Sequence, residues 1–368
     1  MHIVFGIVLL GIIVFFHELG HFIASHLCGV KVESFSIGMG PVLLHKKKWD
    51  TDWRISLLPF GGYCAMKGEK DFDDGESDFT KLPSDSFYGT KAIFRAIIGL
   101  AGPFANFIFA IAAFSSIFMV GYSYYSSEPV VQIASEVYPG MHSAAFDGGM
   151  KTGDKILAIN GEAVSAFTDI PRIVSKKPDE DLIFDIERAG EKIQFSVHSD
   201  FSELENEDGS IVKIGKIGVV SMKVDQAGIG FFSSLKKGSL RTIETTKLYA
   251  QGIASLFKMK SQEISEAVSG PARITTMLGD SMKYGFAATM EFMALINIAL
   301  FFMNLLPIPA LDGWLVLVSI IEAVFKIRIP KKAKTIAQAV GISLIILLFL
   351  FAITSDIKYF VELFHAKN

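Results

Sequence analysis

The stretch "GIIVFFHELGHFIASH" (residues 11–26) places two histidines and a glutamate inside an apolar run near the N-terminus. Polar groups are expensive there, since one charged side chain at the centre of a membrane helix costs roughly 2.5–3.5 kcal/mol on insertion scales. Something must offset that cost. The polar residues of this run are therefore the first candidates for a functional site.

The composition of the chain is that of a membrane protein. Of its 368 residues, 51% are hydrophobic, and the mean hydropathy is +0.42. Adding the 32 glycines raises the apolar share to about 60%, against the 45–50% usual for soluble domains. The net charge of −3 gives no basic field, so no nucleic-acid partner is expected. Cys28 and Cys64 match no cysteine-based zinc pattern and are expected to be free thiols.

Apolar segments long enough to span a bilayer, which takes about 20 residues, cover 3–28, 96–122, 286–307 and 336–353. The first lacks the basic start and the cleavage site of a signal peptide, so we expect it to remain as a membrane helix. A fifth run, 311–325, is short and follows Pro307 and Pro309, which favours a helix buried in the bundle or dipping partway into the membrane. The predicted fold class is a polytopic α-helical membrane protein.

The spans divide the chain into parts. Residues 31–95, with turns such as "PFGGY", predict a membrane-associated β-region, whose open strand edges must pack on protein or line a cavity. Residues 129–220 contain short strands, and "TGDKILAINGE" ends in an Asn-Gly turn, which predicts a compact soluble α/β domain. Residues 221–285 indicate amphipathic connecting helices, which lie either on the membrane surface or on the soluble domain. The membrane helices occupy 1–30, 96–122 and 286–368.

Basic residues set the predicted orientation. Lys and Arg favour cytoplasmic loops. Two loops carry such residues: Lys46, Lys47 and Lys48 after the first span, and Lys331, Lys332 and Lys334 before the fourth. Both loops lie on one side of a four-span chain. The soluble domain and both termini are then expected on the outer side of a bacterial cytoplasmic membrane.

The segment "HELGH" (17–21) is the H-E-x-x-H zinc pattern. Residues i and i+4 share a helix face, so His17 and His21 can present both imidazoles to one ion. Glu18 lies beside that face, within reach of a zinc-bound water whose pKa falls to about 7, and can serve as general base. The alternative is a pair of structural histidines. In a membrane helix, however, an ionisable cluster indicates function, and zinc binding of roughly 10–16 kcal/mol in peptide sites offsets the insertion cost.

A catalytic zinc needs a third protein ligand and one open position. Asp312 in "FFMNLLPIPALDGW" is the remote candidate, because an aspartate in this apolar segment is otherwise hard to justify. The alternative is that Asp312 caps the helix that follows. His26 is a weaker candidate, since it lies on the opposite side of the helix from His17. His45 stands beside three lysines and is expected to be exposed.

These motifs resemble those of bacterial site-2 proteases, which are intramembrane zinc metalloproteases, and most of all the RseP group. Besides "HELGH", the resemblance rests on "GVKVESFSIGMGP" and "ISLLPFGGYCAMKGE" in the β-region, "AGPFAN" (101–106) and "NLLPIPALDG" (304–313). It implies Zn²⁺ held by His17, His21 and Asp312, with Glu18 catalytic. The soluble segment resembles a PDZ domain.

The resemblance also implies substrate-handling roles for Asn304 and Asn106. The structural alternatives are an interhelical hydrogen bond for Asn304 and, for Asn106, an amide that satisfies backbone groups freed by Pro103. Two departures concern substrate gating. The chain has room for one PDZ domain rather than two in tandem, and the usual L-D-G-G is Leu-Asp-Gly-Trp, ending at Trp314.

Three functions compete. The first is cleavage of membrane-spanning segments of single-span proteins, such as anti-sigma factors or remnant signal peptides, in regulated intramembrane proteolysis after an upstream site-1-type protease. The second is metal transport, which predicts acidic or histidine residues on several spans, whereas this chain concentrates them on one span plus Asp312. The third is an inactive PDZ scaffold, which has no need of Glu18. We expect the protease.

Overall fold

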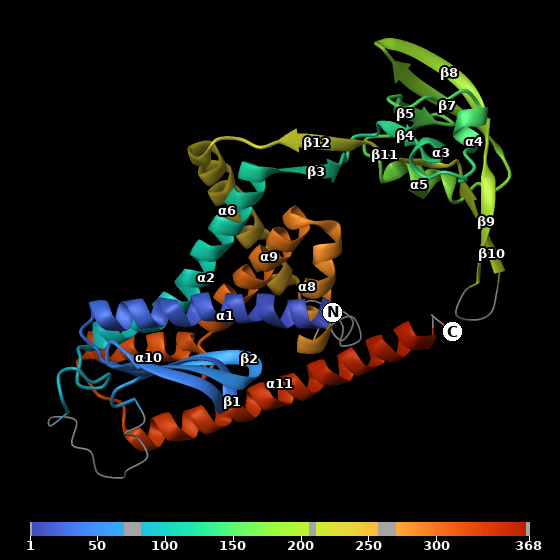
Figure 1. The fold of residues 1–368 in the computed structure, drawn as a ribbon. Coiled ribbons are helices and arrows are strands. Elements are labelled where there is room, and N and C mark those ends of the chain that lie inside the picture. The colour runs from blue at the N-terminus through green and yellow to red at the C-terminus, as the bar shows by residue number, and fades with distance from the viewer. Residues whose placement is uncertain (1, 70–81, 206–210, 257–269, 366–368) are drawn as a thin grey trace. The chain divides into compact units, whose positions relative to one another are not determined.

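The computed structural model describes residues 2–69, 82–205, 211–256 and 270–365 (Figure 1). The chain forms two compact units. One consists of residues 1–120 and 228–368 and contains the long helices, and the other consists of residues 121–227 and contains most of the strands. We refer to them as the helical unit and the strand unit.

Within the described residues, four helices of the helical unit are long and apolar enough to cross a membrane. They are α1 (His2–Leu27), α2 (Ala92–Val120), α9 (Phe286–Leu305) and α11 (Lys331–His365). These helices confirm the predicted spans, and α11 extends well beyond 336–353 at both ends. The protein is a polytopic α-helical membrane protein.

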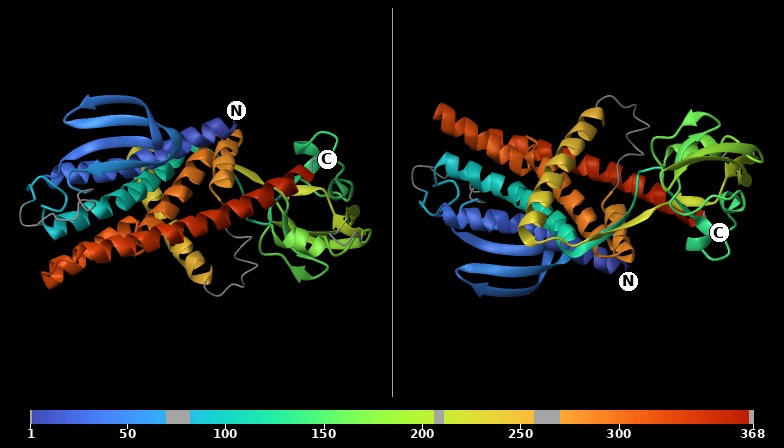
Figure 2. Two further views of the ribbon diagram at one scale, coloured as in Figure 1. Left: turned by 90° about the horizontal axis from the view of Figure 1, so that it is seen from below. Right: turned by 90° about the horizontal axis from the view of Figure 1, so that it is seen from above.

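Helix α2 is the centre of the helical unit. It packs against α1, α6 (Phe231–Leu256), α9 and α10 (Asp312–Phe325), and Figure 2 shows α1 and α9 beside it in both views. Small residues let α1 approach α2 closely. A Cβ at Gly20 would lie 2.3 Å from the carbonyl oxygen of Ala101, so any larger residue would push the two helices apart. This contact holds the "HELGH" turn of α1 directly against α2.

Helix α10 begins just after the proline-broken end of α9. It has 14 residues and buries Val316, Val318 and Glu322, and it is not one of the four candidate spans. The prediction that 311–325 is a short helix packed within the bundle fits this arrangement. Its first residue is Asp312.

The β-region consists of β1 (Val32–Lys48) and β2 (Thr51–Met66), which fold back on themselves. Residues 34–37 pair with 52–55 on one side and with 62–65 on the other, and 42–48 pair with 51–56. The sheet packs on α1, where the rings of Phe22, Phe35 and Trp53 meet at centroid distances of 4.9–5.7 Å. Residues 62–66 form one edge of this sheet, and no other described strand pairs with that edge.

The helices α6 and α8 (Pro271–Ser281) pack on the long helices of the helical unit. Helix α6 packs along α2 and α9, and α8 packs on α1 and is followed by η2 (Met282–Tyr284). The buried Asp356 of α11 accepts hydrogen bonds from the backbone N–H groups of Gly270, Ala272 and Arg273 at the start of α8. The predicted amphipathic stretch continues through 257–269, which lie outside the described residues.

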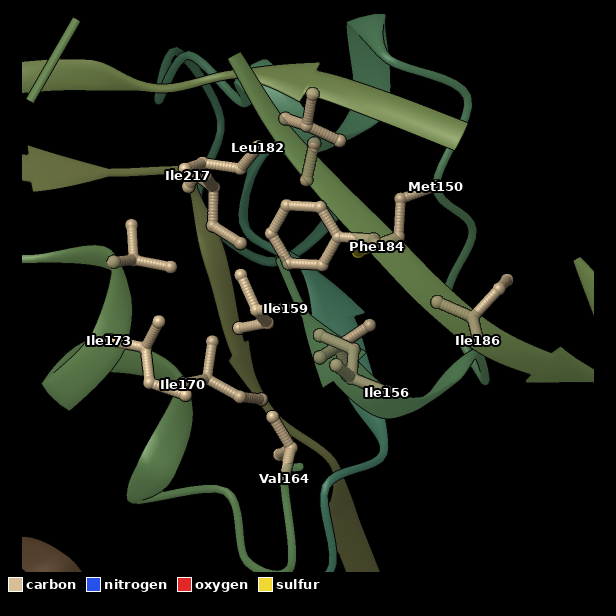
Figure 3. Close-up of a cluster of buried hydrophobic side chains, with 14 of the residues drawn as sticks. Met150, Ile156, Ile159, Val164, Ile170, Ile173, Leu182, Phe184, Ile186 and Ile217 are labelled. Carbon is tan, nitrogen blue, oxygen red and sulfur yellow. The ribbon is translucent and has the colours of Figure 1, made fainter. Parts of the chain in front are cut away.

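The strand unit is an α/β module, as predicted. Its main sheet has the order β6 (Glu162–Ala163), β5 (Lys155–Ile159), β7 (Asp181–Arg188), β8 (Glu191–His198). Asn160 and Gly161 form the predicted turn after β5, both with positive φ. The short helices are α3 (Ala134–Val137), α4 (Ala144–Asp147) and α5 (Asp169–Val174). Figure 3 shows the core between sheet and helices, where Ile156, Ile159 and Phe184 are fully buried.

Among its described residues, the strand unit also has three two-stranded ladders. They are β4 (Val131–Ile133) with β11 (Val219–Ser221), β9 (Asp200–Glu205) with β10 (Ile211–Lys216), and β3 (Gly121–Tyr125) with β12 (Lys223–Ala227). The β3–β12 ladder flanks the expected domain 129–220 at both ends. It joins the two points at which the chain leaves and re-enters the helical unit, so the module is an insertion between α2 and α6.

Candidate metal centre and active site

Three side chains from α1 and α10 converge at one point. His17 and His21 lie one turn apart on α1, and Asp312 is the first residue of α10. Asp312 Oδ2 lies 3.2 Å from His17 Nε2 and 3.4 Å from His21 Nε2, and the two Nε2 atoms are 3.3 Å apart. The structure thus brings together the three ligands predicted from the sequence.

The chemistry of this triad fits a zinc ion. Asp312 Oδ2 is buried, and the described residues that it contacts as ion-pair partners are the two imidazoles, at 3.2 and 3.4 Å. Two imidazole nitrogens and one carboxylate oxygen are a donor set typical of catalytic zinc, which keeps a fourth position for water or substrate. Asp312 is not a helix cap, since Leu311 occupies the N-cap position and no side chain caps the helix. The alternative reading of Asp312 is therefore wrong.

Helix α2 supports both histidines from behind. His21 Nδ1 lies 2.8 Å from the carbonyl oxygen of Ile98, and His17 Nδ1 lies 3.1 Å from the side-chain amide of Asn106. Between them, a Cβ at Gly102 would lie 2.2 Å from His21 Nε2, so only glycine leaves room for the imidazoles. The face of α2 that carries residues 98, 102 and 106 is shaped to the histidine pair.

Glu18 stands between the triad and the β-region. Its carboxylate accepts a hydrogen bond from the backbone of Cys64, and a Cβ at Gly62 would come within 3.2 Å of Glu18 Cγ. Because Glu18 follows the first metal-ligand candidate directly and is held against residues 62–64, it faces the same space as the triad. A carboxylate in this place can accept a proton from a water molecule near the ligands.

The triad opens into a cavity of about 580 Å³. Its wall includes His17, Glu18, His21 and Asp312, together with residues 62–66 of the sheet edge and Trp314 of α10. The far end carries charged side chains from α2, α10 and α11, namely Arg95, Glu322 and Lys334. One space therefore connects the candidate metal ligands, the Glu18 carboxylate and the sheet edge of residues 62–66, which pairs with no further strand among the described residues.

The sequence matches peptidase family M50 over residues 5–348. The chain belongs to this family. A protein of Treponema pallidum named "Putative zinc metalloprotease" is 30% identical over 99% of both chains, and a relative of that name in Campylobacter jejuni is 31% identical over 96% of this chain and 92% of its own. Family M50 contains the site-2 proteases, so the resemblance is confirmed, as is the expectation of a zinc metalloprotease with a Zn²⁺ cofactor.

Among solved structures, the PDZ domain of the SdrC-like protein from Listeria monocytogenes is similar to 27% of this chain and 90% of its own length. The TM-score is 0.19 and the identity 15%.

The remaining sequence candidates of this M50 peptidase lie away from the triad or behind it. Asn304 is half-buried near the end of α9 and is not one of the described residues that line the cavity. Asn106 is fully buried against His17 rather than open to the cavity. His26 is exposed, and its Nδ1 lies 3.0 Å from the carbonyl oxygen of Phe22, so it faces away from the metal centre. His45 pairs with Asp52 on the exposed part of the sheet.

Sequence reasoning missed a buried charged cluster in the same cavity. Arg95 Nη2 lies 2.6 Å from Glu322 Oε2, and Lys334 Nζ lies 2.7 Å from Glu322 Oε1. Glu322 also accepts the backbone N–H of Ile329. The signal was available, because Glu322 is the only acidic residue in the apolar run 313–325.

Proposed function

We propose that this M50 peptidase cleaves the membrane-spanning segments of single-span membrane proteins within the bilayer. One observation carries the proposal: the candidate zinc ligands and Glu18 line a cavity walled by membrane helices and by residues 62–66, a sheet edge with which no other described strand pairs. A site built into the helical unit at this place is suited to a substrate that arrives as a membrane helix.

A helical substrate hides its carbonyl groups in its own hydrogen bonds, so it must unwind before hydrolysis. The edge of residues 62–66 offers the unwound segment a place to add as a further strand, through main-chain hydrogen bonds. Because this edge lies beside Glu18 and the histidines, the added strand would run past the site of chemistry. The wall of the cavity also includes Trp314, two residues after Asp312.

The residues divide the reaction between them. His17, His21 and Asp312 would hold zinc, which supplies a Lewis acid for the scissile carbonyl when bound. The oxygen of the attacking water bonds to the carbonyl carbon, and Glu18 accepts a proton from this water. Glu18 then returns the proton to the leaving amide nitrogen as the C–N bond breaks. The strand edge keeps the peptide extended during both steps.

The class of single-span proteins that would be cleaved depends on the orientation of the protein in the membrane. The protein would lie in the bacterial cytoplasmic membrane with the strand unit outside, which the basic residues at 46–48 and 331–334 support. An outer PDZ-like module can exclude substrates with large outer domains, so that cleavage follows trimming by an upstream site-1-type protease. Anti-sigma factors and remnant signal peptides are substrates of this kind, and their cleavage would be regulated intramembrane proteolysis.

Comparative membrane proteomics tests the activity directly. Cells that carry the Glu18→Gln protein should accumulate single-span proteins or signal-peptide remnants that disappear in wild-type cells, because Gln is nearly isosteric but accepts no proton. Glu69→Gln is the matched control, since Glu69 lines the same cavity and its Oε2 accepts the N–H of Met66, which Gln can also accept. If the Glu18→Gln and wild-type membranes have the same proteins, the proposed function is wrong.

Thiol labelling tests the orientation. In a background without Cys28 and Cys64, single cysteines at Ser165 and Ser84 are exposed to an impermeant reagent in intact cells. Labelling at 165 alone supports an outer strand unit, and labelling at 84 alone overturns it.

Deletion of 129–220 separates two possible roles of the strand unit, size exclusion of substrates and recruitment of substrates. Under size exclusion, untrimmed substrates become cleavable, whereas under recruitment cleavage falls.

A further inference from the structure

Asn106 makes a contact that its sequence context does not predict. It lies on α2 with no exposed surface, and its side-chain amide reaches out of its own helix to His17 Nδ1 on α1, at 3.1 Å. Its Oδ1 atom is buried without any hydrogen-bond partner. A buried amide with an unpaired acceptor carries an energetic cost, so the role of this residue requires an explanation.

The protonation of His17 supplies that explanation. When His17 Nε2 binds a metal, the ring proton is on Nδ1, which becomes a donor and needs an acceptor. The amide nitrogen and oxygen of an asparagine exchange places by a half-turn about χ2. In that orientation Oδ1 accepts the His17 Nδ1–H.

His21 provides the parallel within the same site. Its Nδ1 lies 2.8 Å from the backbone carbonyl oxygen of Ile98, one helical turn before Gly102 on the same face of α2. A carbonyl can only accept, so this contact fixes the proton on Nδ1 and leaves Nε2 free for the ion. Asn106 stands in the same relation to His17, one turn after Gly102, and places a side-chain amide 3.1 Å from His17 Nδ1.

We propose that Asn106 is a positioning residue for the metal centre, which fixes the tautomer and the ring orientation of His17 rather than contacting substrate. The inference rests on the zinc protease function proposed above. Asn106 is not one of the described residues that line the cavity, which separates it from side chains placed to meet a substrate.

A second buried asparagine on a membrane helix shows the contrast. Asn297 on α9 is also without exposed surface, and its Oδ1 also lacks a partner. Its Nδ2, however, donates to the carbonyl oxygen of Met293 in its own helix at 2.8 Å. Asn297 therefore provides a matched control for the loss of a buried amide that has no link to the histidines.

Zinc affinity measured by chelator competition on the purified, detergent-solubilised full chain tests the proposal. Asn106→Leu removes the acceptor at similar volume and should weaken zinc binding about 10–100-fold, as loss of such an outer partner does. Asn106→Asp retains an acceptor oxygen and should keep the affinity within a few-fold of wild type. Asn297→Leu should leave it unchanged. Asn106→Ala is a second variant without an acceptor.

Cobalt substitution adds a readout that a purely structural role would not move. The visible absorption of bound Co²⁺ should shift in Asn106→Leu and return in Asn106→Asp, because the ligand field follows the orientation of the His17 ring. Equal zinc affinity in wild type and Asn106→Leu, or equal losses in Asn106→Leu, Asn106→Asp and Asn297→Leu, would overturn the proposal. A wild-type protein that binds no zinc would overturn it together with the proposed function, whereas one that binds zinc without cleaving any membrane protein removes only the proposed function.

Discussion

The cavity of the helical unit holds two buried polar clusters, which differ in how their buried carboxylate is compensated. At one end, His17, His21 and Asp312 face one another at 3.2–3.4 Å. At the other end, Glu322 forms ion pairs with Arg95 and Lys334 at 2.6 and 2.7 Å.

The difference separates a site for a ligand from a structural cluster. Buried charges persist only when something compensates them. Glu322 has its compensation within the chain, in two cations and a backbone N–H. The Asp312 carboxylate faces only the two imidazoles, at 3.2 and 3.4 Å, so a bound cation would supply the compensation that Glu322 has from Arg95 and Lys334. The same apolar surroundings therefore contain a candidate metal site at one end and an ion-paired cluster between α2, α10 and α11 at the other.

The largest effect is expected from removing one ligand of the triad. Asp312→Ala in the purified full chain should lose most of its bound zinc, because two imidazoles alone leave the ion without its carboxylate. His17→Ala should do the same, whereas Glu18→Gln should keep about one zinc per chain, as expected for a base that is not a ligand. Metal analysis of detergent-solubilised protein measures this. Full zinc occupancy in Asp312→Ala would remove that residue from the ligand set.

The second cluster should respond in stability rather than in metal content. Glu322→Ala leaves Arg95 and Lys334 buried beside each other, and breaking a buried ion pair in this way costs roughly 3–5 kcal/mol of unfolding free energy. Equilibrium unfolding in mixed detergent measures the loss, and zinc per folded molecule should remain unchanged. Simultaneous replacement of Arg95, Glu322 and Lys334 by Met, Leu and Met should restore much of the stability, because no charge is then left uncompensated. If Glu322→Ala loses zinc while keeping its stability, the distinction between the two clusters fails.

The smallest effect concerns exposed clusters in the strand unit. His142 lies between Asp200 and Asp147, and His198 lies between Asp181 and Asp179. Hydrogen bonds to Asp200 and Asp181, respectively, raise the pKa of each histidine above its ordinary value of 6.5. A raised pKa in the folded state adds stability that is complete below pH 6.5 and is lost as the pH rises through the folded-state pKa.

NMR of the full chain with ¹³C-labelled histidine should show both rings titrating above pH 6.5, with His142→Gln and His198→Gln assigning the signals. Proteolytic resistance of the strand unit should fall slightly from pH 6 to pH 8, and less so in the double variant. Ordinary titration of both rings would show that solvent screens the neighbouring carboxylates. Exposed ion pairs would then contribute nothing measurable, which sharpens the contrast with the buried cluster around Glu322.

Much of the metal centre was predictable because its signals are local or chemically conspicuous. The i, i+4 spacing of His17 and His21 predicts a ligand pair on one helix face, with Glu18 beside that face as the predicted base. Asp312 was predicted because placing a carboxylate in an apolar segment costs free energy. The sequence indicated Asn106 as a site residue but did not predict its contact with His17. That contact depends on how α2 packs against α1.

The sequence by itself determined the spans, the inserted α/β module and the chemistry of the ligands, since each depends on hydropathy, periodicity or spacing along a few residues. Only the tertiary structure decided which groups meet across helices. The contact of Gly20 with Ala101 fixes α1 on α2, and this places Ile98 and Asn106 behind the histidines and the edge of residues 62–66 beside Glu18. It also paired Glu322 with Arg95, far away in the sequence. The physical reason is that buried polar groups must find partners, and the choice of partner follows from close packing between elements, which no single segment encodes.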